Sequence, residues 1–292
     1  MTYFLNLLYA GLVTGAVYGM FGLCNCLLFR VSLVLNLAVG DFAMLGAMGV
    51  NFLVSSGVEL AAAIATTLVA IAAATYLYDR IVLHLALDGS RNREGIFVVF
   101  FFTLALSFFI EGMAGSAFGT NVRAAPTLWN GPSLVIFGAH IQRSGVLVLA
   151  TAAVVGVALV LYLRHSLTGK ALTACGQNVL GARVISVKPS TLRRRTFVVM
   201  AVLAAIFGII LSSLTGMTNT SGLGLSFSGL AAASLAGLIS PGRAVSAGLA
   251  IGVGEALIGG YITTQYQTAV LYGILAVLFV SRPSLLGAAA AG

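Results

Sequence analysis

The segment RHSLTGKALTACGQNVLGARVISVKPSTLRRR, residues 164–195, divides the chain and indicates how the rest of it is arranged. It holds seven of the 15 Lys and Arg residues and no Asp or Glu. Apolar runs near 144–163 and 194–216 flank it, and each is long enough to cross a bilayer as a helix. Because loops rich in Lys and Arg stay on the cytoplasmic side of a membrane, the segment predicts a cytoplasmic loop between two membrane helices.

The composition of the whole chain supports this interpretation. Charged residues make up 8% of the chain, whereas a soluble domain averages about 25%, and the mean hydropathy is +1.08. We therefore expect an all-α, polytopic membrane protein. A net charge of +8 can indicate a nucleic-acid partner, but here the basic residues lie between apolar runs, so we expect none.

Apolar runs occur along the entire chain. They fall near 5–29, 33–54, 58–78, 95–118, 144–163, 194–216, 226–240, 243–260 and 264–281. The runs 226–240 and 243–260 are short and are separated by Pro241 and Gly242, a pattern typical of half-helices that do not cross completely. We expect one transmembrane domain, residues 1–292, with eight or nine transmembrane helices or half-helices.

The basic residues also predict an orientation. No Lys or Arg precedes Arg30, which directly follows the first apolar run. The N-terminus is therefore expected outside, and the loop 164–195 in the cytoplasm.

Glycines recur at helical spacing in two of the apolar runs. Gly11, Gly15 and Gly19 form a GxxxGxxxG pattern, and Gly248 and Gly252 form a second GxxxG. Small residues at this spacing let helix backbones approach closely in lipid, so these glycines predict helix packing.

Four polar residues lie in or at the ends of apolar runs: Asn36, Asp41, Glu111 and Glu255. Glu111 lies near an external helix end, where we expect simple solvation, which leaves Asn36, Asp41 and Glu255. A carboxylate at the centre of a membrane helix costs about 2.5–3.5 kcal/mol on insertion scales, so such groups usually face protein or water. They are candidates for a substrate pathway, with Asn36 facing inward and Asp41 ending the segment. The alternative is structural, and for Glu255 a hydrogen bond between helices is the favoured interpretation.

No pattern typical of an enzyme occurs in the sequence. A phosphate-binding P-loop needs G-x-x-x-x-G-K-[ST], and the dipeptide Gly169–Lys170 is followed by Ala171. The three cysteines and three histidines form no metal-ligand spacing. We expect no catalytic site, no cofactor and no bound metal.

The basic loop has a helical pattern of its own. Leu172, Cys175, Val179 and Ala182 recur at three- and four-residue spacing, which places them on one face of a helix beside Lys170. Such a stripe either inserts into a partner's groove or packs on its own helix ends, and periodicity does not separate the two. We favour docking.

Several segments together resemble the permeases of branched-chain amino acid ABC transporters. They are NLAVGD at 36–41, LTGKA at 167–171, LAG at 235–237 and EAL at 255–257, with Gly248 and Gly252 between the last two. The order and spacing of the matches extend over nearly the whole chain, and its size is similar to that of the shorter, LivH-like permease type.

The resemblance implies a function and a set of partners. The chain would form half of a pore in a bacterial inner membrane, beside a second permease that is homologous but different. Two cytoplasmic ATPase subunits would dock on residues 170–186, and an external solute-binding protein would deliver a hydrophobic amino acid.

Three alternatives remain at this stage. Leu37, Val39, Ala236, Ile239 and Arg243 depart from the family pattern, so urea, an amide or an aromatic acid is also compatible as the solute. A membrane scaffold that transports nothing is the second alternative. The polar residues by themselves also allow an ion-coupled secondary transporter in which Asp41 and Glu255 bind the coupling ion.

Overall fold

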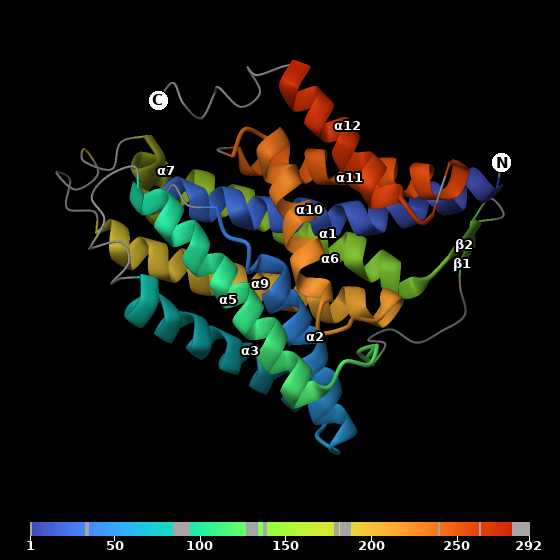
Figure 1. Ribbon diagram of the computed structural model, residues 1–292, viewed down its shortest axis with the longest axis horizontal. Helices are drawn as coiled ribbons and strands as arrows, with labels where there is room; N and C mark the ends of the chain where they lie inside the picture. Colours follow the sequence, from blue (N-terminus) through green and yellow to red (C-terminus); the bar gives the residue numbers. More distant parts are fainter. Residues whose placement is uncertain are drawn as a thin grey trace.

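The computed structural model shows a bundle of α-helices with one short β-hairpin (Figure 1). The structure describes residues 2–32, 35–83, 94–126, 134–136, 139–177, 181, 188–238, 240–262 and 264–281.

The first half of the chain contains four helices and a π-helical turn. They are α1 (Thr2–Ser32), α2 (Val39–Ser55), α3 (Leu60–Tyr78) with the turn η1 (Asp79–Leu83) directly after it, and α5 (Glu94–Phe118). Apolar residues dominate each helix, as expected for helices that bury their backbone polar groups in lipid.

The second half begins with the hairpin β1 (Leu134–Ile136) and β2 (Ala139–Ile141), whose strands pair antiparallel. The helices α6 (Arg143–His165), α7 (Leu167–Gln177), α9 (Pro189–Thr215), α10 (Ser221–Leu235), α11 (Pro241–Tyr261) and α12 (Gln267–Ser281) follow. In Figure 1, α7 and the hairpin lie at opposite ends of the molecule, and we call these the α7 end and the hairpin end.

The expected class of an all-α, polytopic membrane protein is confirmed. Among the described residues, six helices are long and apolar enough to cross a membrane, and α2 and α10 are shorter apolar helices. Three boundaries differ from the sequence prediction. The second helix begins at Val39 rather than near 33, α10 covers 221–235 rather than 226–240, and α11 is a full-length helix. The first turns of α10 were not predicted because they contain serines and glycines, which do not form an apolar run.

The two long helices α1 and α9 form the centre of the bundle. They run across the molecule in opposite directions, and each is followed by a break and then by a short helix (Figure 1). α1 packs mainly on α11 and α10, whereas α9 packs mainly on α2 and also on α1 and α3. The first helix of each unit therefore packs on the later helices of the other: α1 on α10 and α11, and α9 on α2 and α3. Such crossed contacts between the units α1–α2–α3 and α9–α10–α11 are typical of inverted repeats in transporters.

The glycine patterns pack against each other, as predicted. A Cβ atom on Gly15 would overlap the backbone of α11 at Gly248 and Leu249, and one on Gly252 would overlap the backbone of α1 at Gly11 and Gly15. The α1–α11 contact is consequently a backbone-to-backbone crossing that larger residues would separate.

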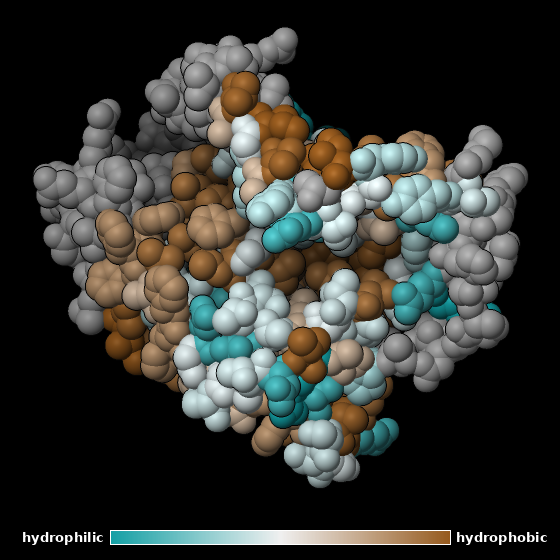
Figure 2. Space-filling model, turned by 45° about the vertical axis from the view of Figure 1, so that its right-hand side comes forward, coloured by the Kyte–Doolittle hydropathy of each residue, from teal (hydrophilic) through white to brown (hydrophobic). Residues whose placement is uncertain are grey.

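Hydrophobic side chains also cover much of the outside of the bundle. Phe108 on α5 is 56% exposed and Val154 on α6 is 69% exposed. Figure 2 shows brown, hydrophobic residues over large parts of one face, with hydrophilic patches between them. Such a surface fits the hydrocarbon of a bilayer.

Candidate functional site

The short helices α2 and α10 begin beside each other inside the bundle. The backbone N–H of Gly40 donates to Ser226 Oγ at 2.8 Å, and a Cβ on Gly222 would overlap Asp41. The two helix starts therefore touch through residues that leave almost no room for side chains. Broken helices that meet in this way frequently line the substrate path of a transporter.

Asn36 lies in the break between α1 and α2 and is fully buried. Its Oδ1 accepts a hydrogen bond from the N–H of Ala38 at 3.0 Å, and its Nδ2 lies 3.5 Å from Met200 Sδ on α9. Sulfur is a weak acceptor, so the amide donor is only partly satisfied. The turn before α2 is thus held by Asn36 rather than by Asp41.

Asp41 lies in the first turn of α2 and is 1% exposed. The helix N-terminus favours a negative charge there. Its carboxylate faces the hydroxyl of Ser107 on α5, and Oδ2 has no other hydrogen-bond partner among the described residues. A buried carboxylate with one hydroxyl beside it therefore lies at the junction of α2, α5 and α10.

Glu255 on α11 connects three helices. Tyr18 on α1 donates its hydroxyl to Oε2 at 2.9 Å, and Thr268 on α12 donates to Oε1 at 2.8 Å. The structure thus contains the helix-to-helix hydrogen bonds that the sequence favoured for this residue. Among the described residues, no Lys or Arg forms an ion pair with its carboxylate.

A cavity of about 290 Å³ lies beside this carboxylate. Tyr18, Glu255 and Thr268 line it together with Ser221 and Ser228 of α10. Ser221 is the first residue of α10, and the dipole at that helix start favours an anionic group. A carboxylate and a helix N-terminus therefore both line this small cavity.

Asn25 is a buried polar residue that the sequence analysis missed. It is 1% exposed, and both polar atoms of its amide lack a hydrogen-bond partner among the described residues. Tyr18, Gly22 and Asn25 follow i, i+4, i+7 spacing on α1, and Gly22 faces Ala232 of α10. The sequence signal that could have identified Asn25 was a single amide side chain between two cysteines in an apolar run.

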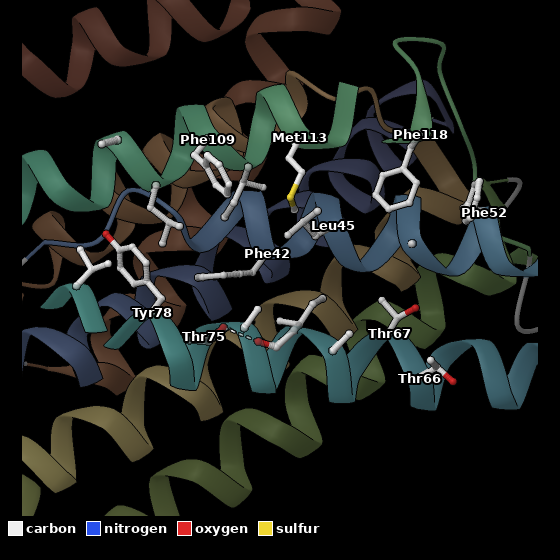
Figure 3. A pocket seen from close by; sticks show the side chains of 18 of the residues that line it. Phe42, Leu45, Phe52, Thr66, Thr67, Thr75, Tyr78, Phe109, Met113 and Phe118 are labelled. Atoms are coloured by element: carbon white, nitrogen blue, oxygen red, sulfur yellow. Dashed lines mark hydrogen bonds between the residues drawn. The ribbon is translucent and has the colours of Figure 1, made fainter. Parts of the chain in front are cut away.

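The largest described cavity has a different character. It measures about 730 Å³ and lies between α2, α3 and α5 (Figure 3). Three of its hydroxyl groups are already bonded to backbone carbonyls: Thr66 to Ala62, Thr75 to Ile71 and Tyr78 to Phe102. Phe109, Met113 and other apolar side chains supply the remaining walls, so this cavity suits hydrocarbon rather than a polar solute.

The helix α7 contains part of the stripe predicted to dock a partner. Leu172 and Cys175 are 5% and 1% exposed and belong to the main core of the bundle, which is the self-packing alternative that periodicity left open. Burial raises the pKa of the Cys175 thiol. Lys170 and Leu167 are exposed instead, Leu167 at 84%. Val179 and Ala182 lie outside the described residues.

No metal centre is formed by the described part of the chain. It contains no group of three His, Cys, Asp or Glu side chains that could hold a metal ion.

The sequence matches a known family over residues 7–280, the family described as branched-chain amino acid transport system / permease component. The high-affinity branched-chain amino acid transport system permease protein LivH of Escherichia coli K12 is 24% identical over 296 residues, which cover 97% of this chain and 94% of LivH. The high-affinity branched-chain amino acid transport system permease protein BraD of Pseudomonas aeruginosa is 24% identical over 299 residues, which cover 97% of this chain and 95% of BraD.

A third relative matches a shorter segment. The autoinducer 2 import system permease protein LsrC of Yersinia enterocolitica is 32% identical over 116 residues, which cover 39% of this chain and 31% of LsrC. No solved structure matches the chain significantly. The ion-coupled alternative is set aside by the family match, which covers almost all of the chain. The chain belongs to the branched-chain amino acid transport system permease family, the non-catalytic membrane components of ABC importers.

Proposed function

We propose that this chain forms half of the pore of an importer for a branched-chain amino acid, driven by two ATPase subunits docked at its α7 end. That end faces the cytoplasm of a bacterial inner membrane, because residues 164–195 are strongly basic. A second, homologous permease completes the pore, and an external binding protein delivers the solute at the hairpin end.

The observation that carries this proposal is the cavity beside Glu255. Its volume of about 290 Å³ is close to the lower limit of ligand pockets, roughly 300–1,000 Å³. The carboxylate has two hydroxyl donors and, among the described residues, no cationic partner. The ammonium group of an amino acid supplies the missing positive charge.

The other end of an amino acid is matched by α10. Ser221, the first residue of this helix, lines the same cavity as Glu255. Half-helix N-termini bind the carboxylate of amino-acid substrates in other transporters through their dipole and free N–H groups. A zwitterion therefore fits between Glu255 and α10, with Leu211 and Leu225 of the same lining beside its side chain.

Two further polar positions extend the path through the bundle. Asn25 lies on the α1 face that follows Tyr18 toward the α7 end. Asp41, supported by Asn36 in the preceding turn, lies where α2 meets α10. Their unsatisfied polar atoms give a moving zwitterion or its water a place to form hydrogen bonds.

The ATPase contact is assigned to the exposed side of α7. Leu167 and Lys170 are exposed, whereas Leu172 and Cys175 are buried and anchor the helix to the bundle. A helix that is anchored on one face and exposed on the other can pass a partner's movement directly to α1, α6 and α9, which it touches.

Uptake by cells that contain the complete transporter tests the proposal. Labelled leucine should accumulate while ATP is present, and excess valine or isoleucine should compete, whereas collapse of ion gradients with ATP maintained should have little effect. Competition by a small amide but not by valine would move the solute class to amides. Accumulation that depends on an ion gradient would contradict the ATP-driven assignment.

A further inference from the structure

A second polar cavity, of about 680 Å³, opens at the α7 end of the molecule. Four basic side chains from four helices line it: Arg30 at the end of α1, Arg164 at the end of α6, Lys170 in α7 and Arg243 in the first turn of α11. Among the described residues that line the cavity, none is acidic. Like charges repel, so this arrangement favours the entry of an anion.

The start of α11 adds to the positive potential. Pro241 is the first residue of the helix, and the side chain of the preceding residue, Ser240, makes no capping hydrogen bond. The N–H groups of Gly242 and Arg243, in the first turn, have no partner within the helix. Gly242 and Arg243 both line the cavity, so backbone N–H donors and guanidinium groups surround the same space.

We propose that this cavity binds the phosphate group of an anionic membrane lipid. Inorganic phosphate has the same chemistry, but the surroundings favour the lipid. Val160 and Leu163 of α6 form an apolar wall of the cavity, and Val157 and Leu161 on the same helix are 59% and 50% exposed. Acyl chains can therefore extend along α6 from a headgroup held by the basic residues.

A bound headgroup would join α1, α6, α7 and α11 at one point. The structure already connects two of these helices, because Arg30 Nη1 lies 3.5 Å from Thr173 Oγ1 of α7. A lipid that binds only the folded chain stabilises it by mass action and fixes the position of α7 on the bundle. The proposal thus goes beyond the transport function and assigns a lipid requirement to the coupling helix.

The test uses the purified full chain in detergent and native mass spectrometry. Phosphatidylglycerol, phosphatidylcholine and sodium phosphate are titrated separately against wild type and the double variant Arg164→Gln/Arg243→Gln. Arg195→Gln is the matched control, because Arg195 is an exposed arginine of the same end that does not line the cavity. Arg243→Lys keeps the charge and should keep the lipid.

The expected result is preferential retention of phosphatidylglycerol by wild type and by Arg195→Gln. Each cationic side chain near an anionic lipid surface contributes about fivefold, so the double variant should bind roughly 25-fold more weakly. Thermal midpoints without added lipid show whether the double variant is folded. If it is not folded, lipid retention is compared between the single variants Arg243→Gln, which loses the charge, and Arg243→Lys, which keeps it.

Four outcomes would overturn the proposal. The first two are equal retention of the two lipids and unchanged binding by folded variants. The third is loss of ATPase co-purification with normal lipid binding, which would make the cavity a protein contact. The fourth is complete displacement of phosphatidylglycerol by sodium phosphate, which would show that a free anion, not a lipid, occupies the site.

Discussion

Arg193 Nε donates a hydrogen bond to Asp79 Oδ1 at 2.9 Å, and this buried pair ties the end of α3 to the first turn of α9. Arg194 Nε donates to the second carboxylate oxygen at 3.0 Å, so Asp79 is shared by two arginines. Both arginines lie at the C-terminal end of the basic segment 164–195, which also contains α7. We expect movement of that segment to reach α3 as well as α9.

Asp79→Ala should strongly destabilise the permease. The side chain of Arg193 is 8% exposed and would be left as a buried, unpaired charge, which typically costs about 3–5 kcal/mol. Arg194→Gln should cost at most about 1 kcal/mol, because that side chain is 22% exposed. Thermal unfolding in detergent measures both, and equal midpoints for the two variants would contradict the assigned difference.

Asn25→Leu should separate stability from function. Removing a buried amide without hydrogen bonds relieves a desolvation penalty of about 1–3 kcal/mol, so the folded state should be as stable as wild type or more so. Uptake should nevertheless fall, because the path loses its hydrogen-bonding position. Thr67→Val is the control, since its buried hydroxyl also lacks a partner but lines the apolar cavity. If both variants transport equally well, Asn25 has no part in the path.

Leu172→Asp and Leu167→Asp should fail in different ways. Leu172 is 5% exposed within the core, so a carboxylate there should lower the abundance and thermal midpoint of the permease itself. Leu167 is 84% exposed, so the same change should leave the permease intact and reduce co-purification of the ATPase subunits. Normal ATPase retention by Leu167→Asp would exclude this side of α7 as the docking surface.

The thiol of Cys175 should react slowly with a membrane-impermeant maleimide. Burial raises its pKa, so little of the reactive thiolate is present at about pH 7, and labelling should increase as the pH is raised toward about 9. Cys24 and Cys26 are fully buried in α1 and should not interfere. Lys170→Cys introduces an exposed thiol in the same helix and should label quickly; equal rates at both positions would show that Cys175 is not packed on the bundle.

The helices were predictable because lipid imposes a strict rule. Every backbone group in hydrocarbon must be bonded within its own segment, so long apolar runs become helices wherever they cross. α10 was placed about five residues too late because Ser221, Gly222 and Ser226 are weakly apolar, although tertiary contacts with α2 hold them in a helix.

The site was less predictable, since it depends on partners distant in sequence. The sequence identified Glu255 as an intramembrane carboxylate, but not that Tyr18 and Thr268 donate to it from two other helices. Periodicity found the stripe at Leu172 and Cys175 but not the side it faces. The pairing of Asp79 with Arg193 joins residues 114 positions apart and leaves no local pattern.

ATP-driven leucine uptake by the Glu255→Gln variant tests the central claim most directly. The amide oxygen of Gln can accept a hydrogen bond from one of the hydroxyls of Tyr18 and Thr268, and its NH2 group can donate to the other. Abundance and thermal midpoint should therefore stay close to wild type, whereas Glu255→Leu should lower both. Losing one charge-assisted hydrogen bond to the solute ammonium, about 1.5–3 kcal/mol, should reduce uptake at limiting leucine roughly tenfold or more. Wild-type uptake by folded Glu255→Gln at equal abundance would contradict the claim that this carboxylate binds the solute.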